Sequence, residues 1–338
     1  MIIRENVSIK RFNTFGIDVK TRFFIEVFSQ KELAIFIRQN LYGFSSFLVL
    51  GGGSNILFLR DYDGVIIKMS SKGITQVDEN EENVFIKVQA GETWDDFVKY
   101  CVENSLGGIE NLSLIPGTVG ACPIQNIGAY GSEVKDTIVR VETLNTENGN
   151  ICEFLNKDCK FGYRNSIFKN EVKGKHIITS VIFKLFKNPQ PNIAYKSLAG
   201  IFEKNLSDKI TISAVRQAVC AIRKEKLPDP EKLGNAGSFF KNPIISQQKY
   251  NELKTIFPDF PAYVQIDGSY KIAAGWLIEQ TGWKGKRLGE AGVHEKQALV
   301  LINFGKATGM DIWNLSEKII LSVFEKFGTR LEREVNIV

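Results

Sequence analysis

The sequence predicts an α+β protein of two or three domains. Its 338 residues are about twice the length of a typical single domain. Apolar residues make up 43% and charged residues 24%, which is ordinary for a folded globular chain and excludes a disordered one. Strand and helix patterns alternate at first, a β-rich stretch follows, and the last third mixes helices with strands.

The first 72 residues are predicted to form a β-α-β unit. Residues 22–28 and 64–69 have the apolar and aromatic content of strands, and residues 30–40 between them have the pattern of a short helix. Residues 47–50 form a further buried strand that runs directly into three glycines.

A β-rich second unit is predicted from residue 73 to about residue 220. It opens with a strand at 83–89 and an amphipathic helix with Thr93 as its N-cap. The apolar positions of this helix are Trp94, Phe97, Val98, Cys101 and Val102. Further strands are expected at 138–144, 151–155 and 177–185, followed by a loop-rich insertion at 186–209 and a helix at 212–222.

A last domain is predicted for residues 221–338, after the break Leu227-Pro228-Asp229-Pro230. We expect a helix at 272–280, a strand at 298–303, a long helix at 311–327 and a final strand at 331–338.

Charge gives a weak indication of partners. Lys and Arg number 43 against 38 Asp and Glu, a net charge of +5, which fits an anionic small substrate or simply a mixed solvated surface. The charges are interspersed, with no block of the kind that binds nucleic acid. No stretch reaches 18 uninterrupted apolar residues, and the first residues lack the pattern of a signal peptide, so we expect no membrane span.

Cysteine and histidine usage also excludes some classes. The five cysteines form no C-x-x-C pair and predict buried thiols in a reducing cytoplasm. They are Cys101, Cys122, Cys152, Cys159 and Cys220. With only His176 and His294, a histidine metal site or a Ser–His–Asp triad is not expected.

Two glycine-rich segments are candidates for ligand contact. The turn at 51–55 (GGGSN) follows a buried strand, and consecutive glycines there can direct backbone N–H groups at an anion such as a pyrophosphate, or merely form a turn. It matches neither the Rossmann fingerprint nor the P-loop. The apolar stretch 115–131 suits a backbone packed against a large flat ligand or, alternatively, a tight core crossover.

Four side chains are candidates for chemistry. Arg164 can bind a carboxylate or hold developing negative charge. Ser238 has no adjacent histidine to make it a nucleophile, but it can donate a proton to a strongly basic carbanion. Glu332 and Glu334 alternate along the predicted final strand and should therefore project from one face.

Taken in series, eight segments resemble the UDP-N-acetylenolpyruvoylglucosamine reductase (MurB) family over nearly the whole chain. They are NTFGI at 13–17, LGGGSN at 50–55, IPGTVGACPIQNIGAYG at 115–131, FGYRNSIFK at 161–169, LPDP at 227–230, GNAGSFFKNP at 234–243, AAGWLIEQ at 273–280 and LEREV at 331–335. Each segment alone is weak, but the set in this order is very specific.

The resemblance implies an FAD-binding fold of the vanillyl-alcohol-oxidase (PCMH) type. Its two lobes would be residues 1–72 and 73–220, and residues 221–338 would form a smaller substrate-binding domain whose last strand carries the catalytic glutamate. An insertion at about 186–209 would make this a loop-bearing (type I) member. FAD would be non-covalent, because neither histidine lies in the matching segments.

The resemblance also implies the roles of individual residues. The catalytic set would be Arg164, Ser238 and Glu334. FAD would be bound by Gly51, Gly52, Gly53, Ser54, Asn55, Pro116, Gly117, Thr118, Gly120, Ala121, Gln125, Asn126, Gly128, Ala129 and Tyr130. Substrate would be bound by Tyr163, Tyr195, Lys226, Asn242 and Gln297, and no metal is expected.

The implied activity is reduction of UDP-N-acetylglucosamine enolpyruvate to UDP-N-acetylmuramate, an early step of peptidoglycan synthesis. NADPH would reduce FAD, flavin N5 would pass hydride to the enolpyruvyl methylene carbon, and Ser238 would supply the proton. We expect a cytoplasmic oxidoreductase, a monomer whose partners are NADPH and the UDP-sugar rather than nucleic acid or membrane.

Two other hypotheses remain open from the sequence. One is a flavin oxidase or dehydrogenase of the same superfamily that acts on another sugar or alcohol. The other is a nucleotide-sugar or nucleic-acid binding protein without catalysis, which the positive charge and the 24 phenylalanines permit.

Overall fold

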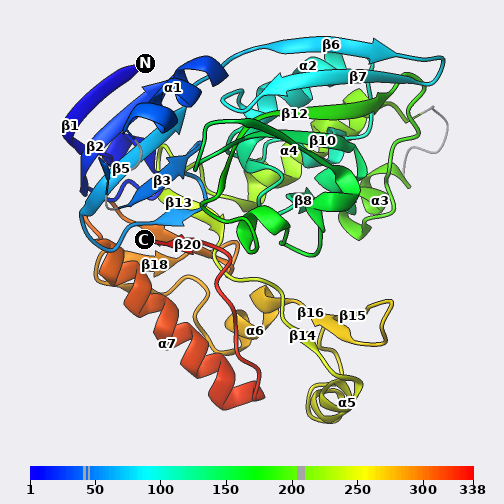
Figure 1. The fold of residues 1–338 in the computed structure, drawn as a ribbon. Coiled ribbons are helices and arrows are strands. Elements are labelled where there is room, and N and C mark those ends of the chain that lie inside the picture. The colour runs from blue at the N-terminus through cyan, green and yellow to red at the C-terminus, as the bar shows by residue number, and fades with distance from the viewer. Residues whose placement is uncertain (41–42, 45, 204–209) are drawn as a thin grey trace. The chain divides into compact units, whose positions relative to one another are not determined.

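The computed structural model describes residues 1–40, 43–44, 46–203 and 210–338, and Figure 1 draws its fold. Helices and strands are mixed along the chain, which confirms the predicted α+β class. Residue contacts divide the chain into two compact units, each assembled from several segments. The first unit comprises Met1–Val7, Thr21–Gly52 and Tyr62–Arg223, and the second comprises Ser8–Lys20, Gly53–Asp61 and Lys224–Val338.

The first unit contains a four-stranded sheet in the order β1-β2-β5-β3. Its strands are β1 (Ile2–Ser8), β2 (Lys20–Val27), β3 (Phe47–Leu50) and β5 (Tyr62–Met69). β5 pairs in parallel with both β2 and β3, and α1 (Gln30–Asn40) connects β2 to β3. The core between helix and sheet consists of Ile25, Val27, Leu33, Phe36, Ile37, Val65, Ile67 and Met69. The predicted order of strand and helix is confirmed, with the predicted bounds for α1 and β3.

A five-stranded antiparallel sheet forms the second part of this unit, in the order β11-β10-β12-β7-β6. Its strands are β6 (Ile74–Glu79), β7 (Asn83–Gln89), β10 (Ile138–Asn145), β11 (Ile151–Leu155) and β12 (His176–Phe186). The four strands expected here are confirmed to within one residue at each end. In Figure 1 they are drawn in cyan and green.

Helix α2 (Trp94–Glu103) packs its apolar face against this sheet. The ring of Phe97 lies 4.9 Å from that of Phe183 on β12, and Trp94 lies 6.0 Å from each. Thr93 occupies the predicted N-cap position, but its side chain makes no capping bond. Instead, the backbone N–H of Trp94 donates to the carbonyl of Gly117 (3.0 Å), which ties the helix to the glycine-rich stretch.

The predicted insertion contains a helix that the sequence did not indicate. Residues 196–202 form α3 (Lys196–Phe202), in which Leu198 is the buried position. A helix of seven residues is too short to show a 3.6-residue period, so it was expected as loop. α4 (Ile212–Lys226) follows and continues past its predicted end at residue 222. Residues 204–209 of the insertion lie outside the described residues.

The second unit contains two small sheets, in the orders β13-β19-β18-β17 and β14-β16-β15, and a parallel pair of β4 with β20. The strands are β4 (Ile56–Leu57), β13 (Gly234–Ser238), β14 (Ile244–Ile245), β15 (Ala262–Val264), β16 (Tyr270–Ile272), β17 (Arg287–Leu288), β18 (Ala291–Val293), β19 (Val300–Asn303) and β20 (Asn336–Ile337). The helices are α5 (Gln247–Ile256), α6 (Ala274–Gln280) and α7 (Gly309–Phe327).

Both ends of α7 are fixed by local chemistry. The Thr308 hydroxyl accepts from the backbone N–H of Asp311 (3.2 Å), and the Asp311 carboxylate accepts from the N–H of Thr308 (2.8 Å), which is a capping box. Gly328 ends the helix with a φ of +61°, the left-handed geometry that favours glycine. The long helix predicted at 311–327 is thus confirmed, with its start two residues earlier.

The final strand differs from the prediction. Residues 331–338 were expected to form one continuous strand, but regular pairing is confined to β20 and an isolated bridge between Arg333 and Phe240. A bend at Val335 separates the Arg333 bridge from β20. Glu332 is exposed and Glu334 is buried, so the two carboxylates have different surroundings.

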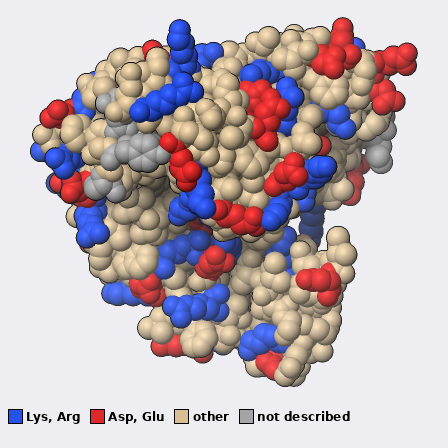
Figure 2. Space-filling model, viewed as in Figure 1, with Lys and Arg blue, Asp and Glu red and all other residues tan. Residues whose placement is uncertain are grey.

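The cysteines are free thiols, three of them buried and two half-buried. Burial raises the pKa of Cys159 to about 12, so this thiol stays protonated at neutral pH. Within the described residues, every helix is too short or too polar to cross a membrane. Figure 2 shows Lys and Arg side chains interspersed with Asp and Glu over the visible face, as the sequence pattern predicts.

An ion pair joins α2 to α4 inside the first unit. Nη1 and Nη2 of Arg216 donate to the two carboxylate oxygens of Asp95 at 2.7 and 2.9 Å. Asp95 also accepts from the backbone N–H of Leu114. Burial tends to raise the pKa of Asp95, but the bonds from Arg216 and Leu114 outweigh it and hold this pKa below its usual value.

We expect this ion pair to make the stability of the protein depend on acid pH. The folded pKa of Asp95 lies below the unfolded one, so its contribution is full above about pH 4 and is lost as pH falls through the folded pKa. Between about pH 6 and about pH 3, wild type should lose more unfolding free energy in urea than Asp95→Asn. Arg216→Met should behave like Asp95→Asn; equal losses in all three proteins would contradict the prediction.

Candidate active site

The glycine turn after β3 packs directly against the second glycine-rich stretch, within the first unit. A Cβ added at Gly51 would lie 2.6 Å from Oγ1 of Thr118, and one added at Gly52 would lie 2.8 Å from the Cα of Gly117. Contacts this short with backbone cannot be relieved by a rotamer change. Glycine at position 52 is therefore required by the approach of two backbones, whereas the close contact at position 51 is with the side chain of Thr118.

The stretch 115–131 is anchored on the loop before α2. The N–H of Val119 donates to the carbonyl of Glu92, and the N–H of Gly120 donates to that of Ala90, both at 2.9 Å. A Cβ at Gly120 would come within 2.6 Å of the Ala90 methyl group. Part of the glycine content here is thus explained by packing, the alternative that the sequence left open beside ligand contact.

The end of this stretch forms a hairpin that projects Tyr130. β8 (Gly128–Ala129) pairs with β9 (Ser132–Glu133), and the two residues between them, Tyr130 and Gly131, have φ of +48° and +82°. Positive φ at both central positions is typical of a type I′ turn. Nδ2 of Asn111 donates to the Tyr130 carbonyl at 2.9 Å and holds the turn in place.

Arg164 sits in a two-residue turn with strained backbone. Gly162 and Asn165 bond to each other through both backbone pairs (3.0 and 3.2 Å), with Tyr163 and Arg164 between them. Arg164 has a φ of +52°, and its Nη2 donates to the carbonyl of Gly128 at 2.9 Å. Its guanidinium lies 5.8 Å from the Tyr163 ring. A non-glycine residue held at positive φ has a strained backbone, and such strain is often found at functional sites.

Positive φ at non-glycine residues concentrates in this region. Seven such residues occur in the described part of the chain, and five of them lie in or beside the segments that carry predicted site residues. Those five are Leu114, Asn126, Tyr130, Lys160 and Arg164. Asn126 links two of the segments, because its Nδ2 donates to the Gly162 carbonyl at 3.0 Å.

Tyr195, the predicted loop tyrosine, is half exposed and packs edge-to-face on Tyr130 at 5.5 Å. Arg223 of α4 lies beside Tyr130 and donates through Nε to the carbonyl of Leu114 (3.2 Å). Burial raises the pKa of Tyr130 although the Arg223 guanidinium opposes this, and burial lowers the pKa of Arg223. The buried guanidinium of Arg223 thus lies beside Tyr130, which packs against Tyr195.

In the second unit, the NTFGI loop holds the rest of the glycine turn. Gly53 has a φ of +65°, and a Cβ there would lie 2.0 Å from the carbonyl oxygen of Phe12. Thr14 connects two segments, since its N–H donates to the carbonyl of Gly53 (3.0 Å) and its hydroxyl donates to the carbonyl of Asn235 (2.6 Å). Asn55 in turn accepts from the N–H of Asn336 at 3.1 Å. Ser54 is half-buried in the same turn.

Glu334 lies beside the strand that ends in Ser238. The N–H of Glu334 donates to the carbonyl of Phe239 at 2.8 Å, and Arg333 bridges Phe240 in antiparallel fashion. Ser238 is half-buried and is paired with Val300 of β19. The structure therefore places Glu334 against Phe239, the residue that directly follows Ser238.

The remaining predicted residues of the second unit have different environments. Oδ1 of Asn242 accepts from the N–H of Ala274 (2.9 Å) at the start of α6, and Oε1 of Gln297 accepts from the N–H of Leu299 (3.3 Å). Lys226 is exposed at the last residue of α4. The described contacts thus give Asn242 and Gln297 a local structural role in addition to any ligand contact.

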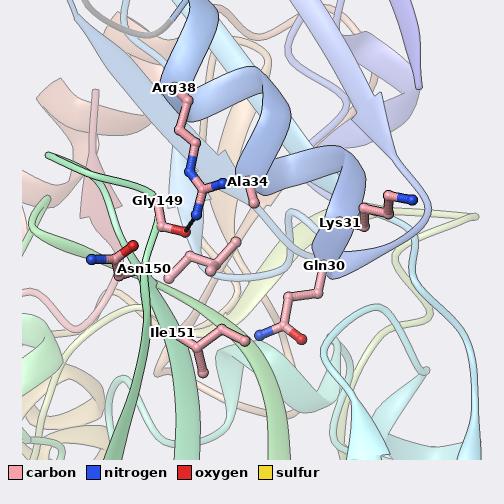
Figure 3. A pocket seen from close by; sticks show the side chains of 8 residues that line it. Gln30, Lys31, Ala34, Arg38, Gly149, Asn150 and Ile151 are labelled. Carbon is pink, nitrogen blue, oxygen red and sulfur yellow. Dashed lines mark hydrogen bonds between the residues drawn. The ribbon is translucent and has the colours of Figure 1, made fainter.

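An open pocket of about 610 Å³ in the first unit lies apart from all these residues. Figure 3 shows it between α1 and the turn before β11, with Arg38 donating to the carbonyl of Gly149 (3.2 Å). None of the predicted site residues lines it.

Sequence reasoning missed two arginines that support the site. Arg216 and Arg223 are seven residues apart and directly follow Val215 and Ile222 of the apolar stripe of α4, so they flank the buried face. An arginine at the edge of a buried helix face is rarely buried without a partner. The seven-residue spacing of these two arginines along the apolar stripe could therefore have indicated buried partners. Asn111 carried no recognisable signal.

The first unit defines the class of protein. Residues 23–154 match the family model of an FAD binding domain. The N–H groups of Gly51 and Gly52 donate to no backbone carbonyl within the described residues, at a turn where added Cβ atoms would collide, and this fits a bound pyrophosphate. The chain is an FAD-binding protein.

Comparison of the whole chain gives the family. Residues 229–338 match the C-terminal domain of UDP-N-acetylenolpyruvoylglucosamine reductase. The proteins of that name from Flavobacterium johnsoniae and Pseudomonas savastanoi are 48% and 47% identical to this chain, over 100% and 99% of it and 100% and 98% of their own lengths. The structure of the Thermus caldophilus reductase has the same fold, with a TM-score of 0.69 and 24% identity over 99% of both chains. The chain belongs to the UDP-N-acetylenolpyruvoylglucosamine reductase family.

The packing of the glycine turn predicts that an added methyl group is harmful at Gly52 and tolerated at a glycine with free space around it. Gly52→Ala places a Cβ against the backbone of Gly117, so we expect a loss of roughly 1–3 kcal/mol of stability and at least about tenfold weaker FAD binding. Gly200→Ala is the matched control, because no atom lies within 4 Å of its added Cβ in α3. Thermal unfolding and flavin fluorescence titration measure both quantities. Equal behaviour of the two variants would show that the turn tolerates a side chain.

Proposed function

We propose that this chain reduces the enolpyruvyl ether of a UDP-N-acetylglucosamine to the corresponding lactyl ether, with NADPH as reductant and FAD as non-covalent cofactor. The product would be UDP-N-acetylmuramate, a precursor of peptidoglycan. The observation that carries the proposal is the backbone pairing of Glu334 with Phe239, next to Ser238, in a chain of this family. The FAD-loaded protein, as a cytoplasmic monomer, would need only NADPH and the UDP-sugar for turnover.

The FAD-binding role is assigned to the two glycine-rich segments. FAD supplies the two-electron carrier between NADPH and substrate. The turn at 51–55 would hold its pyrophosphate through backbone N–H groups, and the stretch 116–130 would lie along the remainder. We propose residues 1–72 and 73–220 as the two lobes of this region and residues 221–338 as the substrate-binding domain, which the family-model matches at 23–154 and 229–338 support.

Arg164 is proposed to stabilise negative charge. Addition of hydride to the methylene carbon leaves charge on the adjacent carbon, delocalised into the carboxylate. A guanidinium is always protonated and presents two parallel donors to such a group. The bond from Arg164 to the Gly128 carbonyl and the strained turn fix its position before substrate arrives.

Ser238 is proposed to protonate that carbon. A hydroxyl is a weak acid, but an enolate carbon is basic enough to take its proton when the donor is positioned. Glu334, at 9% exposure and bonded through its backbone to Phe239, would support Arg164 or donate a hydrogen bond of its own.

Substrate binding is assigned to the remaining predicted residues. Lys226 and Asn242 would contact the diphosphate, Gln297 would make a further contact, and Tyr195 and Tyr163 would also contact the substrate. The exposure of Lys226 and Tyr195 in this structure is compatible with that role.

The proposal is tested by separating the two half-reactions in anaerobic stopped flow. The FAD-loaded protein is reduced with one equivalent of NADPH and then mixed with the enolpyruvyl UDP-sugar, with the oxidised-flavin absorbance as readout. Ser238→Ala should leave reduction unchanged and slow reoxidation by about 10²–10⁴-fold, because a positioned proton donor is lost.

Ser322→Ala is the matched control, since the Ser322 hydroxyl donates to the carbonyl of Lys318 within α7, away from the predicted site residues. It should match wild type in both half-reactions. Reoxidation of wild type by oxygen but not by the enolpyruvyl compound would overturn the proposed substrate. Unimpaired reoxidation in Ser238→Ala would overturn the assignment of the proton donor.

A further inference from the structure

Arg333 makes a three-part contact with α7 that none of the proposed catalytic roles uses. Its guanidinium carbon lies 3.8 Å from the ring centroid of Trp313, its Nε donates to Oγ of Ser316 at 2.9 Å, and its Nη2 pairs with Glu317. The side chain is only 17% exposed. Trp313, Ser316 and Glu317 are spaced i, i+3 and i+4, so they form one patch on the helix surface.

The backbone of the same residue belongs to the ladder that holds Glu334. Arg333 bridges Phe240, and its two neighbours continue the pairing: the N–H of Lys241 donates to the carbonyl of Glu332 (2.9 Å), and the N–H of Glu334 donates to the carbonyl of Phe239. The position of Glu334 is therefore determined by the pairing of a short segment between the end of α7 and β20. That segment has only this one bridge as regular pairing in the described structure.

Register in such a short ladder is weakly determined by the backbone alone. A slip of one residue would exchange Glu334 with Arg333 or Val335 and remove the carboxylate from its place beside Phe239. The Arg333 contact resists this slip, because its stacking, its bond to Ser316 and its ion pair are satisfied together only in the observed register.

We propose that Arg333 is a positioning residue for Glu334: its clamp on Trp313, Ser316 and Glu317 sets the register that presents the carboxylate. The inference rests on the proposed catalytic role of Glu334. Arg333 itself touches neither substrate nor cofactor in this scheme.

The test compares Arg333→Met with Glu334→Gln in the same anaerobic half-reactions. Methionine retains an unbranched stem over Trp313 but cannot donate hydrogen bonds. We expect Arg333→Met to slow reoxidation by the enolpyruvyl UDP-sugar by about 10- to 100-fold, the usual effect of a small misplacement, with reduction by NADPH unchanged and substrate KM within about threefold. Arg333→Lys should be intermediate, because lysine keeps the charge but not the planar fork.

Lys326→Met is the matched control on the same helix. The Lys326 ammonium also lies over an aromatic ring (5.6 Å from Phe327) and donates to a carbonyl, that of Gln280 at 2.6 Å. It should lower the unfolding temperature without slowing reoxidation. If both variants slow reoxidation equally, the effect of Arg333 is general destabilisation and the inference is overturned.

A double mutant distinguishes positioning from other causes. In the Glu334→Gln background, Arg333→Met should slow reoxidation by less than about twofold more, because two residues that act through one group are not additive. Fully multiplied effects would overturn the inference while leaving the role of Glu334 intact. If Glu334→Gln alone reoxidises at the wild-type rate, the proposed role of Glu334 fails first, and the positioning inference fails with it.

Ser316→Ala covers the case in which Arg333→Met does not fold. It removes one acceptor of the clamp, and we expect reoxidation to slow by about two- to fivefold, with the same non-additivity toward Glu334→Gln. A wild-type rate in Ser316→Ala together with a wild-type rate in Arg333→Lys would overturn the proposal.

Discussion

The second unit depends on backbone segments that approach so closely that only glycine fits between them. The NTFGI loop contacts Gly53 through the carbonyl of Phe12 and contacts Gly234 through the carbonyl of Phe15, with added Cβ atoms falling at 2.0 and 2.3 Å. Thr14 bonds to the segments of both glycines. The loop thereby fixes the glycine turn relative to β13, and β13 leads into Ser238 and the ladder of Glu334. The NTFGI loop, the glycine turn, β13 and the segment of Glu334 are separate motifs in the sequence. In the structure they are linked to one another by packing and backbone hydrogen bonds.

Much of the secondary structure could be predicted, because it is determined by local pattern. α1, β3, β7 and β11 have the predicted bounds, because an apolar pattern read locally determines each of them. α3 and the bend at Val335 were missed, because a seven-residue helix and a single irregular residue leave no periodic signal. That residues 8–20 and 53–61 pack with the C-terminal part of the chain could not be inferred either, since this depends on contacts remote in sequence.

The candidate site was likewise predictable only in part. The residue types at Arg164, Ser238 and Glu334 suggested their chemistry, which stays a prediction. What holds these residues did not follow from sequence pattern: the positive φ of Arg164, the bond from Asn126 to Gly162 and the contact of Arg333 with α7 are properties of the folded chain. The continuous final strand expected at 331–338 was wrong, because pairing is interrupted at Val335. The different burial of Glu332 and Glu334 depends on what packs around each carboxylate, which the sequence pattern does not show.

The parallel pair of β4 with β20 has a consequence for how the chain is made. Ile56 pairs with Asn336, so a strand synthesised early has to wait for a partner that is synthesised much later. During that interval residues 56–58, whose apolar side chains are buried in the finished protein, are not yet paired with β20. A late-closing contact of this kind slows folding and exposes a nascent chain to chaperones, whereas the sheet of β7, β10 and β12 can assemble while synthesis continues.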